Sequence, residues 1–194
     1  MKFASESKYL NLLYKRGFIF SDQPVTVPAP TWEILKLGHY WFGYDSFTPF
    51  VSKIQYSSWG ILLGLTFDLF NNSLNAMNIL EKLLLNWDAS NEKFYNYLDT
   101  LSGRFLLMIG KGEKAYVFQD ACGMRSVFYS AQYPRIASHL NLLLDNLPEV
   151  ALDKKFEGLL EKYTSYHLPG FYTTYENIFS LTPNTFLSLS EQKI

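Results

Sequence analysis

The centre of this chain shows two hydrophobic patterns, one typical of a buried strand and one typical of a helix. Residues 59–67 form a nearly continuous apolar run, which predicts a strand buried on both faces. The triplet Asn71-Asn72-Ser73 then gives a helix-start signal. The apolar positions after it recur at helical spacing and predict an amphipathic helix: Met77, Leu80, Leu83, Leu84 and Trp87.

A second helix and three strands follow. The pattern predicts the helix over residues 92–101, with Phe94, Tyr97, Leu98 and Leu101 on one side. The strands are predicted over residues 105–109, 115–119 and 127–129. The first two are joined by a hairpin turn at residues 110–112.

The two ends of the chain complete the predicted set of elements. The first fifteen residues have an amphipathic helical pattern, residues 18–20 could begin a strand, and Pro24, Pro28 and Pro30 indicate an extended connection. Residues 136–146 look like a strand turning into a helix, and residues 153–163 like a helix with Asp153 as N-cap. A strand follows Pro183. Strands and helices in this order favour an α+β sandwich, and no linker divides the chain, so we expect one domain over residues 1–194.

Composition narrows the function classes. Of 194 residues, 48% are hydrophobic, which fits one globular domain with a sizeable core. A net charge of −1 without clustered Lys or Arg speaks against nucleic-acid binding. No apolar run is long enough to span a membrane and no signal peptide is visible, so we expect a cytoplasmic protein. The single cysteine, Cys122, excludes an intrachain disulfide, and we expect it to be a small buried hydrophobe.

Residues 98–130 carry a resemblance. Their text, with L-S-G-R-F-L-L-M, a turn, and then D-A-C-G-M-R-S-V-F-Y, resembles the core of the class II glutamine amidotransferase domain of asparagine synthases. Two further stretches resemble that family in the same order: R-I-A-S-H-L-N-L-L-L at 135–144 and E-N-I-F-S-L-T-P-N-T-F-L-S-L at 176–189. The resemblance covers residues 60–190 well and residues 1–59 only weakly.

The resemblance implies a fold and a partner. The fold would be a four-layer αββα sandwich of the N-terminal nucleophile hydrolase type. In asparagine synthases this domain precedes an ATP-pyrophosphatase synthetase domain that carries S-G-G-x-D-S, a motif absent here. The hypothesis is therefore an N-terminal fragment whose main partner is its own C-terminal synthetase domain. ATP and magnesium are expected only in that domain, and no cofactor in this one. Homodimer formation stays open.

The same resemblance puts glutamine hydrolysis in doubt. The family uses an N-terminal cysteine whose own α-amino group is the base, but this chain begins Met-Lys-Phe. Gly64 matches the glycine of the family's oxyanion segment, but Leu63 stands where an asparagine should donate a hydrogen bond. Residues 73–75 hold no carboxylate for the substrate's amino group. We therefore predict a degenerate site, similar to that of beta-lactam synthetase, in which Gly64 is a vestige.

Two alternatives to a degenerate scaffold remain. One is an active amidohydrolase matured at Ser5 or Ser7, although both serines also suit ordinary polar positions near a helix start. The other is a free-standing interaction module, whose surface would be the aromatic segment of residues 40–47 if that segment does not pack in the core.

The turn after residue 119 holds the other candidate residues. Asp120, Gly123 and Arg125 look like a structural turn, with the Asp120 carboxylate accepting backbone N–H groups and Arg125 bridging to it. Arg125 could also dock the synthetase domain. The three histidines are too widely spaced to predict a metal site.

Overall fold

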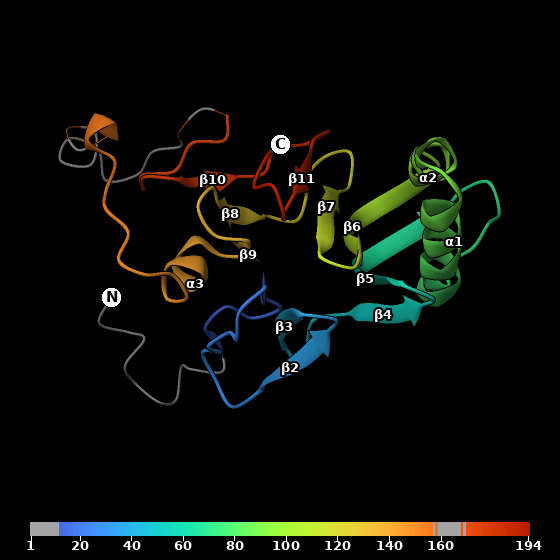
Figure 1. Ribbon diagram of the computed structural model, residues 1–194, viewed down its shortest axis with the longest axis horizontal. Coiled ribbons are helices and arrows are strands. Elements are labelled where there is room, and N and C mark those ends of the chain that lie inside the picture. Colours follow the sequence, from blue (N-terminus) through green and yellow to red (C-terminus); the bar gives the residue numbers. More distant parts are fainter. Residues whose placement is uncertain (1–11, 157, 159–167, 169) are drawn as a thin grey trace.

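The computed structural model describes residues 12–156, 158, 168 and 170–194, and its main feature is a pair of antiparallel sheets. The five-stranded sheet has the order β11-β7-β6-β5-β4 and the six-stranded sheet the order β10-β8-β9-β1-β3-β2 (Figure 1). The strands of the first are β4 (Phe50–Gln55), β5 (Ser58–Asp68), β6 (Leu101–Lys111), β7 (Lys114–Gln119) and β11 (Phe186–Ser188). The strands of the second are β1 (Phe18–Ser21), β2 (Trp32–Leu37), β3 (Tyr40–Asp45), β8 (Phe128–Ser130), β9 (Arg135–Ala137) and β10 (Ile178–Ser180).

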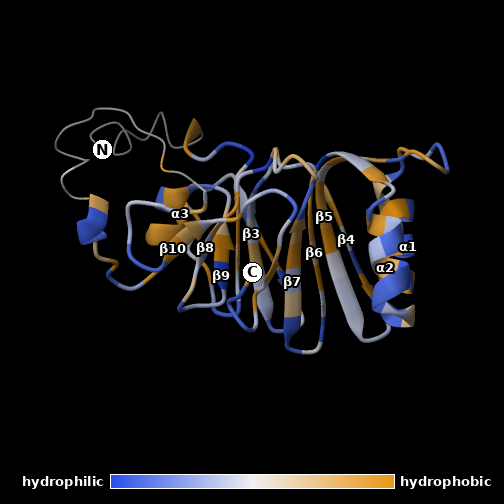
Figure 2. Ribbon diagram, turned by 90° about the horizontal axis from the view of Figure 1, so that it is seen from above, coloured by the Kyte–Doolittle hydropathy of each residue, from blue (hydrophilic) through white to orange (hydrophobic). Residues whose placement is uncertain are grey.

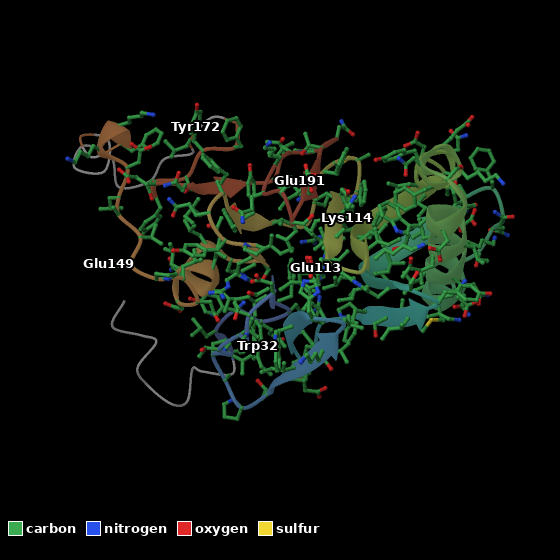
Figure 3. All side chains as sticks on the ribbon, in the orientation of Figure 1. Trp32, Glu113, Lys114, Glu149, Tyr172 and Glu191 are labelled. Atoms are coloured by element: carbon green, nitrogen blue, oxygen red, sulfur yellow. The ribbon has the colours of Figure 1, made fainter. Side chains whose placement is uncertain are left out.

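The two sheets face each other across an aromatic-rich core. Phe20 and Tyr40 come from the six-stranded sheet and Trp59 from the five-stranded one, and the three rings lie 4.9 to 5.5 Å apart. The Tyr40 hydroxyl also donates to the carbonyl oxygen of Glu113 at 2.7 Å. Glu113 and Lys114 lie at the β6–β7 turn (Figure 3), so this bond ties the hairpin to the opposite sheet.

Helices cover both outer faces. Helices α1 (Ala76–Ala89) and α2 (Asn91–Leu98) pack on the five-stranded sheet: Leu83 and Phe94 belong to the same buried cluster as Leu107 of β6. On the far side, Leu143 of α3 (Leu140–Leu144) belongs to the same buried cluster as Ile19 of β1. Figure 2 shows α1 and α2 at one side, α3 at the other and both sheets between them. The predicted α+β sandwich is confirmed.

The long central strand was predicted almost to the residue, and it explains the apolar run. β5 alternates between the inter-sheet core, where Ile61 and Leu63 lie, and the face under α1, where Leu62 lies. Gly60 lies under Leu80, and a Cβ there would press against that side chain. A strand covered on both faces needs no polar positions.

Two predicted boundaries were wrong for local reasons. The first helix begins after Asn75 and not at residues 71–73, because the Asn75 side chain accepts hydrogen bonds from the backbone N–H groups of Met77 and Asn78. The second helix ends at Leu98 and not at 101, because Leu101 already belongs to β6 and pairs with Asp68. The strand predicted over 105–109 is therefore much longer at its start.

The predicted terminal helices fall largely outside the described residues. Within the described part, residues 13–16 form a turn, and Tyr14 and Arg16 have φ angles of 55° and 58°, which a helix does not allow. Near residue 153, Lys154–Phe156 is a single 3₁₀ turn, in which the Asp153 carboxylate accepts from the N–H of Lys155 at 3.0 Å. Among the described helices, none is long and apolar enough to cross a membrane.

The position of Cys122 differs from the one expected. Cys122 is exposed, so the expectation of a buried thiol was wrong: the residue lies in the turn between β7 and β8, outside both sheets.

The aromatic segment of residues 40–47 packs mostly in the core, with Tyr40 and Phe42 at 2% and 0% exposure. Phe47, at 62%, is the exception.

Candidate functional site

A cleft opens where one end of the five-stranded sheet meets one end of the six-stranded sheet. Its volume is about 700 Å³, which suits a small-molecule ligand. The turn before β1, the β3–β4 loop, β5, β6 and the segments beside β8 and β9 supply its lining: Lys15, Arg16, Phe18, Ser46, Phe47, Thr48, Pro49, Gly64, Leu65, Arg104, Arg125, Ser126, Ser138 and His139.

The start of β1 is fixed tightly at the cleft wall. The Asp45 carboxylate accepts from the backbone N–H of Arg16 at 2.6 Å, and the N–H of Asp45 donates to the Gly17 carbonyl oxygen at 3.1 Å. The Thr48 hydroxyl donates to the same carbonyl at 3.1 Å. Any side chain at Gly17 would collide with the Tyr14 carbonyl oxygen. These contacts hold the backbone of Arg16 in a defined position at the cleft.

Gly64, the expected vestige of an oxyanion site, does line the cleft. Its backbone N–H donates to the Pro49 carbonyl oxygen at 2.8 Å and so extends the β4–β5 ladder. The side chain of Leu63 is fully buried in the inter-sheet core. At this point of β5, neither the backbone N–H nor the neighbouring side chain can donate to a substrate.

The turn after β7 is organised by Asp120. Its carboxylate is 1% exposed and accepts from the backbone N–H groups of Cys122 (3.1 Å) and Met124 (3.1 and 3.2 Å). Gly123 has a φ of +59° and donates its N–H to the Asp120 carbonyl oxygen at 2.8 Å. A Cβ at Gly123 would press on Pro183. The turn thus needs both an acidic acceptor and a glycine.

Arg125 does not form the expected bridge. It makes no ion pair with Asp120, whose oxygens are taken up by backbone N–H groups. Its own carbonyl oxygen accepts from the Gln119 side chain at 2.6 Å, and the residue lines the cleft. Asp120 and Arg125 therefore do not form the expected pair. Asp120 organises the turn, and Arg125 is a positively charged residue of the cleft lining.

Three arginines line this cleft: Arg16, Arg104 and Arg125. Burial lowers the pKa of Arg125, and the neighbouring charges of Arg104 and Arg16 lower it further, while Asp120 acts in the opposite direction. Arg104 donates its Nε–H to the Met124 carbonyl oxygen at 3.1 Å. Because the net change in the pKa of Arg125 is downward, desolvation and like-charge repulsion outweigh the nearby carboxylate.

His139 also lines the cleft. Its Nδ1 lies 2.8 Å from the Ser138 hydroxyl, and its ring centroid lies 5.2 Å from that of Tyr14. Burial lowers the pKa of His139 below its ordinary value, so the ring is neutral at pH 7. Ser138 is fully engaged, since it accepts from the N–H of Phe18 at 2.9 Å. We find no serine–histidine–carboxylate arrangement among these described residues.

The other predicted positions lie elsewhere. Ser5 and Ser7 fall outside the described residues. Asn75 caps α1 and does not line the cleft. Sequence reasoning missed the contributions of Lys15, Arg16 and Arg104, which follow no motif. Within the described part of the chain, no three His, Cys, Asp or Glu side chains gather as metal ligands would.

The comparisons with known proteins give distant likenesses to solved structures only. No family model matches the chain, and no curated protein matches it. Among solved structures, the chain is similar to glutamine phosphoribosylpyrophosphate amidotransferase from B. subtilis, solved with ADP and GMP. The identity is 13% and the TM-score 0.39, over 76% of this chain and 42% of the other, so the chain spans less than half the length of that protein. A likeness this weak carries no inference about activity.

Proposed function

We propose that this chain is the glutaminase-like domain of an asparagine-synthase-type protein and that it does not hydrolyse glutamine. Three stretches that resemble the family, in the family's order, support the kinship. Two facing antiparallel sheets with helices on both outer faces are consistent with the N-terminal nucleophile hydrolase type of sandwich.

The observation that carries the loss of hydrolysis is the bond between Gly64 and Pro49. An oxyanion site needs donors aimed at the position where charge develops. The N–H of Gly64 already donates within the sheet at 2.8 Å, and Leu63 has no donor. The single cysteine, Cys122, lies in the β7–β8 turn and outside the described cleft lining. That lining therefore lacks both a thiol nucleophile and the expected oxyanion donors.

The proposed role is that of a scaffold beside an ATP-dependent synthetase domain. Such a domain would activate a carboxylate as its adenylate and pass it to an amine or to ammonia. ATP and magnesium would bind there, and no cofactor is proposed for the present chain. Reading the gene beyond the Ile194 codon tests this proposal, which expects an open frame that reaches S-G-G-x-D-S.

The deciding assay compares nitrogen donors. The full gene product, incubated with ATP, magnesium and a carboxylate substrate, is expected to release pyrophosphate with ammonia but not with glutamine. The purified domain alone is expected to form no glutamate from glutamine above a heat-denatured control. Glutamate release that depends on folded protein would refute the degenerate site, and intact-mass analysis would then show whether processing had exposed Ser5 or Ser7.

A further inference from the structure

Among the residues that the structure describes, the cleft lining contains cations and no carboxylate. Lys15, Arg16, Arg104 and Arg125 come from three separate parts of the chain, and no Asp or Glu belongs to the described lining. The whole chain has a net charge of −1, so this concentration is local and not a consequence of a basic protein. Clefts lined by one sign of charge concentrate ligands of the opposite sign.

The guanidinium groups have no carboxylate partner inside the described part of the protein. Among the described residues, Arg16, Arg104 and Arg125 form no ion pair. The Nη1 atom of Arg125 is buried and has no hydrogen-bond partner there. A buried donor without a partner costs free energy, and a charged one costs more, unless a ligand supplies the acceptor. The lowered pKa of Arg125, caused first by burial and then by Arg104 and Arg16, agrees with this unbalanced charge.

Hydroxyl groups complete the set of donors. Ser46 and Ser126 are exposed at the cleft, and neither hydroxyl bonds to another residue in the described part of the chain. Thr48 and Ser138 are committed to the backbone at the start of β1 and so stiffen the wall. The described cleft lining thus combines arginines, exposed hydroxyls and a backbone that hydrogen bonds hold in place.

This chemistry selects among anions. An amino acid carries an ammonium group, and the described lining offers no carboxylate to receive it. A carboxylate ligand brings one negative charge, whereas a phosphate group brings nearly two and three strong acceptor oxygens. Guanidinium forks match phosphate oxygens in a bidentate manner. We propose that the cleft is a binding site for a small molecule that bears a phosphate group, held by Arg104 and Arg125 with Arg16 and Lys15 at its edge.

This inference rests on the cleft lining and not on the proposed kinship. A glutamine-binding site would be the expectation from the resemblance alone, and the absence of a carboxylate in the described lining argues against it. The two proposals therefore fail separately: glutamate release overturns the loss of hydrolysis, and the titrations below decide the phosphate site.

The test is calorimetric titration of the purified chain with inorganic phosphate and with pyrophosphate, at constant ionic strength. Malonate and L-glutamine are the comparison ligands. We expect pyrophosphate to bind with a dissociation constant below about 1 mM and more tightly than malonate. Arg125→Gln should weaken binding at least about tenfold, because a charge-assisted bond to the ligand is lost. Arg104→Gln should also weaken it, so the test survives if one variant fails to fold.

Lys114→Gln is the matched control. It removes one positive charge at the β6–β7 turn (Figure 3). Arg104 lies near the other end of β6, which runs from Leu101 to Lys111. It should bind pyrophosphate like the wild type. Equal binding by Arg125→Gln and wild type, or no phosphate binding by folded wild-type protein, would overturn the proposal. Stronger binding of malonate or L-glutamine than of pyrophosphate would overturn the assigned ligand class.

Discussion

The backbone N–H of Gly64 donates to the carbonyl oxygen of Pro49 at 2.8 Å. This bond continues the β4–β5 ladder into the cleft, where β5 runs past Arg104. Gly64 has a φ of +93°, and a Cβ there would collide with the Arg104 carbonyl oxygen. The glycine is therefore required by the sheet, and its presence does not by itself indicate an oxyanion site.

Gly64→Ala should destabilise the fold strongly. The positive φ and the collision together predict a loss of about 3 kcal/mol in the free energy of unfolding. Gly112→Ala is the matched control, because Gly112 also has a positive φ, of 60°, but nothing lies within 4 Å of the place its Cβ would take. It should lose only about 1 kcal/mol. Urea unfolding measures both, and equal losses would show that the close approach at Gly64 is not decisive.

A second prediction concerns the buried carboxylate at the end of β5. Asp68 is 1% exposed and accepts from the Tyr97 hydroxyl at 2.8 Å, which joins α2 to the sheet. Tyr97→Phe should lower the free energy of unfolding by about 1.5 kcal/mol, since a hydrogen bond to a charged group is lost. Tyr56→Phe, at an 87% exposed position, should change it by less than about 0.5 kcal/mol. Similar changes in both variants would contradict the role of this bond.

The same carboxylate predicts a pH dependence. Burial by itself would raise the pKa of Asp68, but hydrogen bonds from Asn71, Tyr97 and Lys82 outweigh it and lower the pKa from 3.8 to about 2. Because the folded pKa lies below the unfolded one, the stabilisation is present above about pH 4 and is lost as the pH falls towards 2. The difference in unfolding free energy between wild type and Asp68→Asn should therefore shrink between about pH 5 and pH 2. A difference that stays constant over this range would refute the assignment.

The sequence predicted the elements whose signals are local. The apolar run at 59–67 and the hairpin at 110–112 needed no knowledge of the rest of the chain, and both are found in the structure as β5 and the β6–β7 turn. The start of α1 was missed by a few residues because three polar residues precede Asn75, and only the backbone shows which of them caps the helix.

The cleft could not be predicted in the same way. Arg16 lies far from Arg104 and Arg125 in the sequence, and the fold brings the three side chains to one end of two sheets. Arg125 was expected to pair with Asp120, but backbone N–H groups satisfy that carboxylate first. Competition between local and long-range partners is decided by geometry that a pattern of residue types does not contain.

The exposed thiol gives a direct chemical prediction. Cys122 lies in the turn that Asp120 organises, and it is exposed. Native protein should therefore react with iodoacetamide at one site, at a rate similar to that of the urea-unfolded chain. Cys122→Ser provides the blank. A thiol that reacts only after unfolding would contradict the exposed turn.

The arginine cluster predicts a gain in stability when one charge is removed. With Arg104 and Arg16 nearby and no ion pair to Arg125 among the described residues, the charge of Arg125 is a cost to the ligand-free fold. Arg125→Gln should raise the free energy of unfolding by on the order of 1 kcal/mol at low ionic strength, and added sodium chloride should reduce this gain by screening the repulsion. Lys114→Gln, far from the cluster, should show neither effect.

If Arg125→Gln is instead less stable than wild type at low salt, the guanidinium contributes packing or pairing that outweighs the repulsion. Binding sites often contain residues that lower the stability of the ligand-free fold but are needed to bind the ligand, because selection for function tolerates the loss of stability. The expected behaviour of Arg125 fits this pattern.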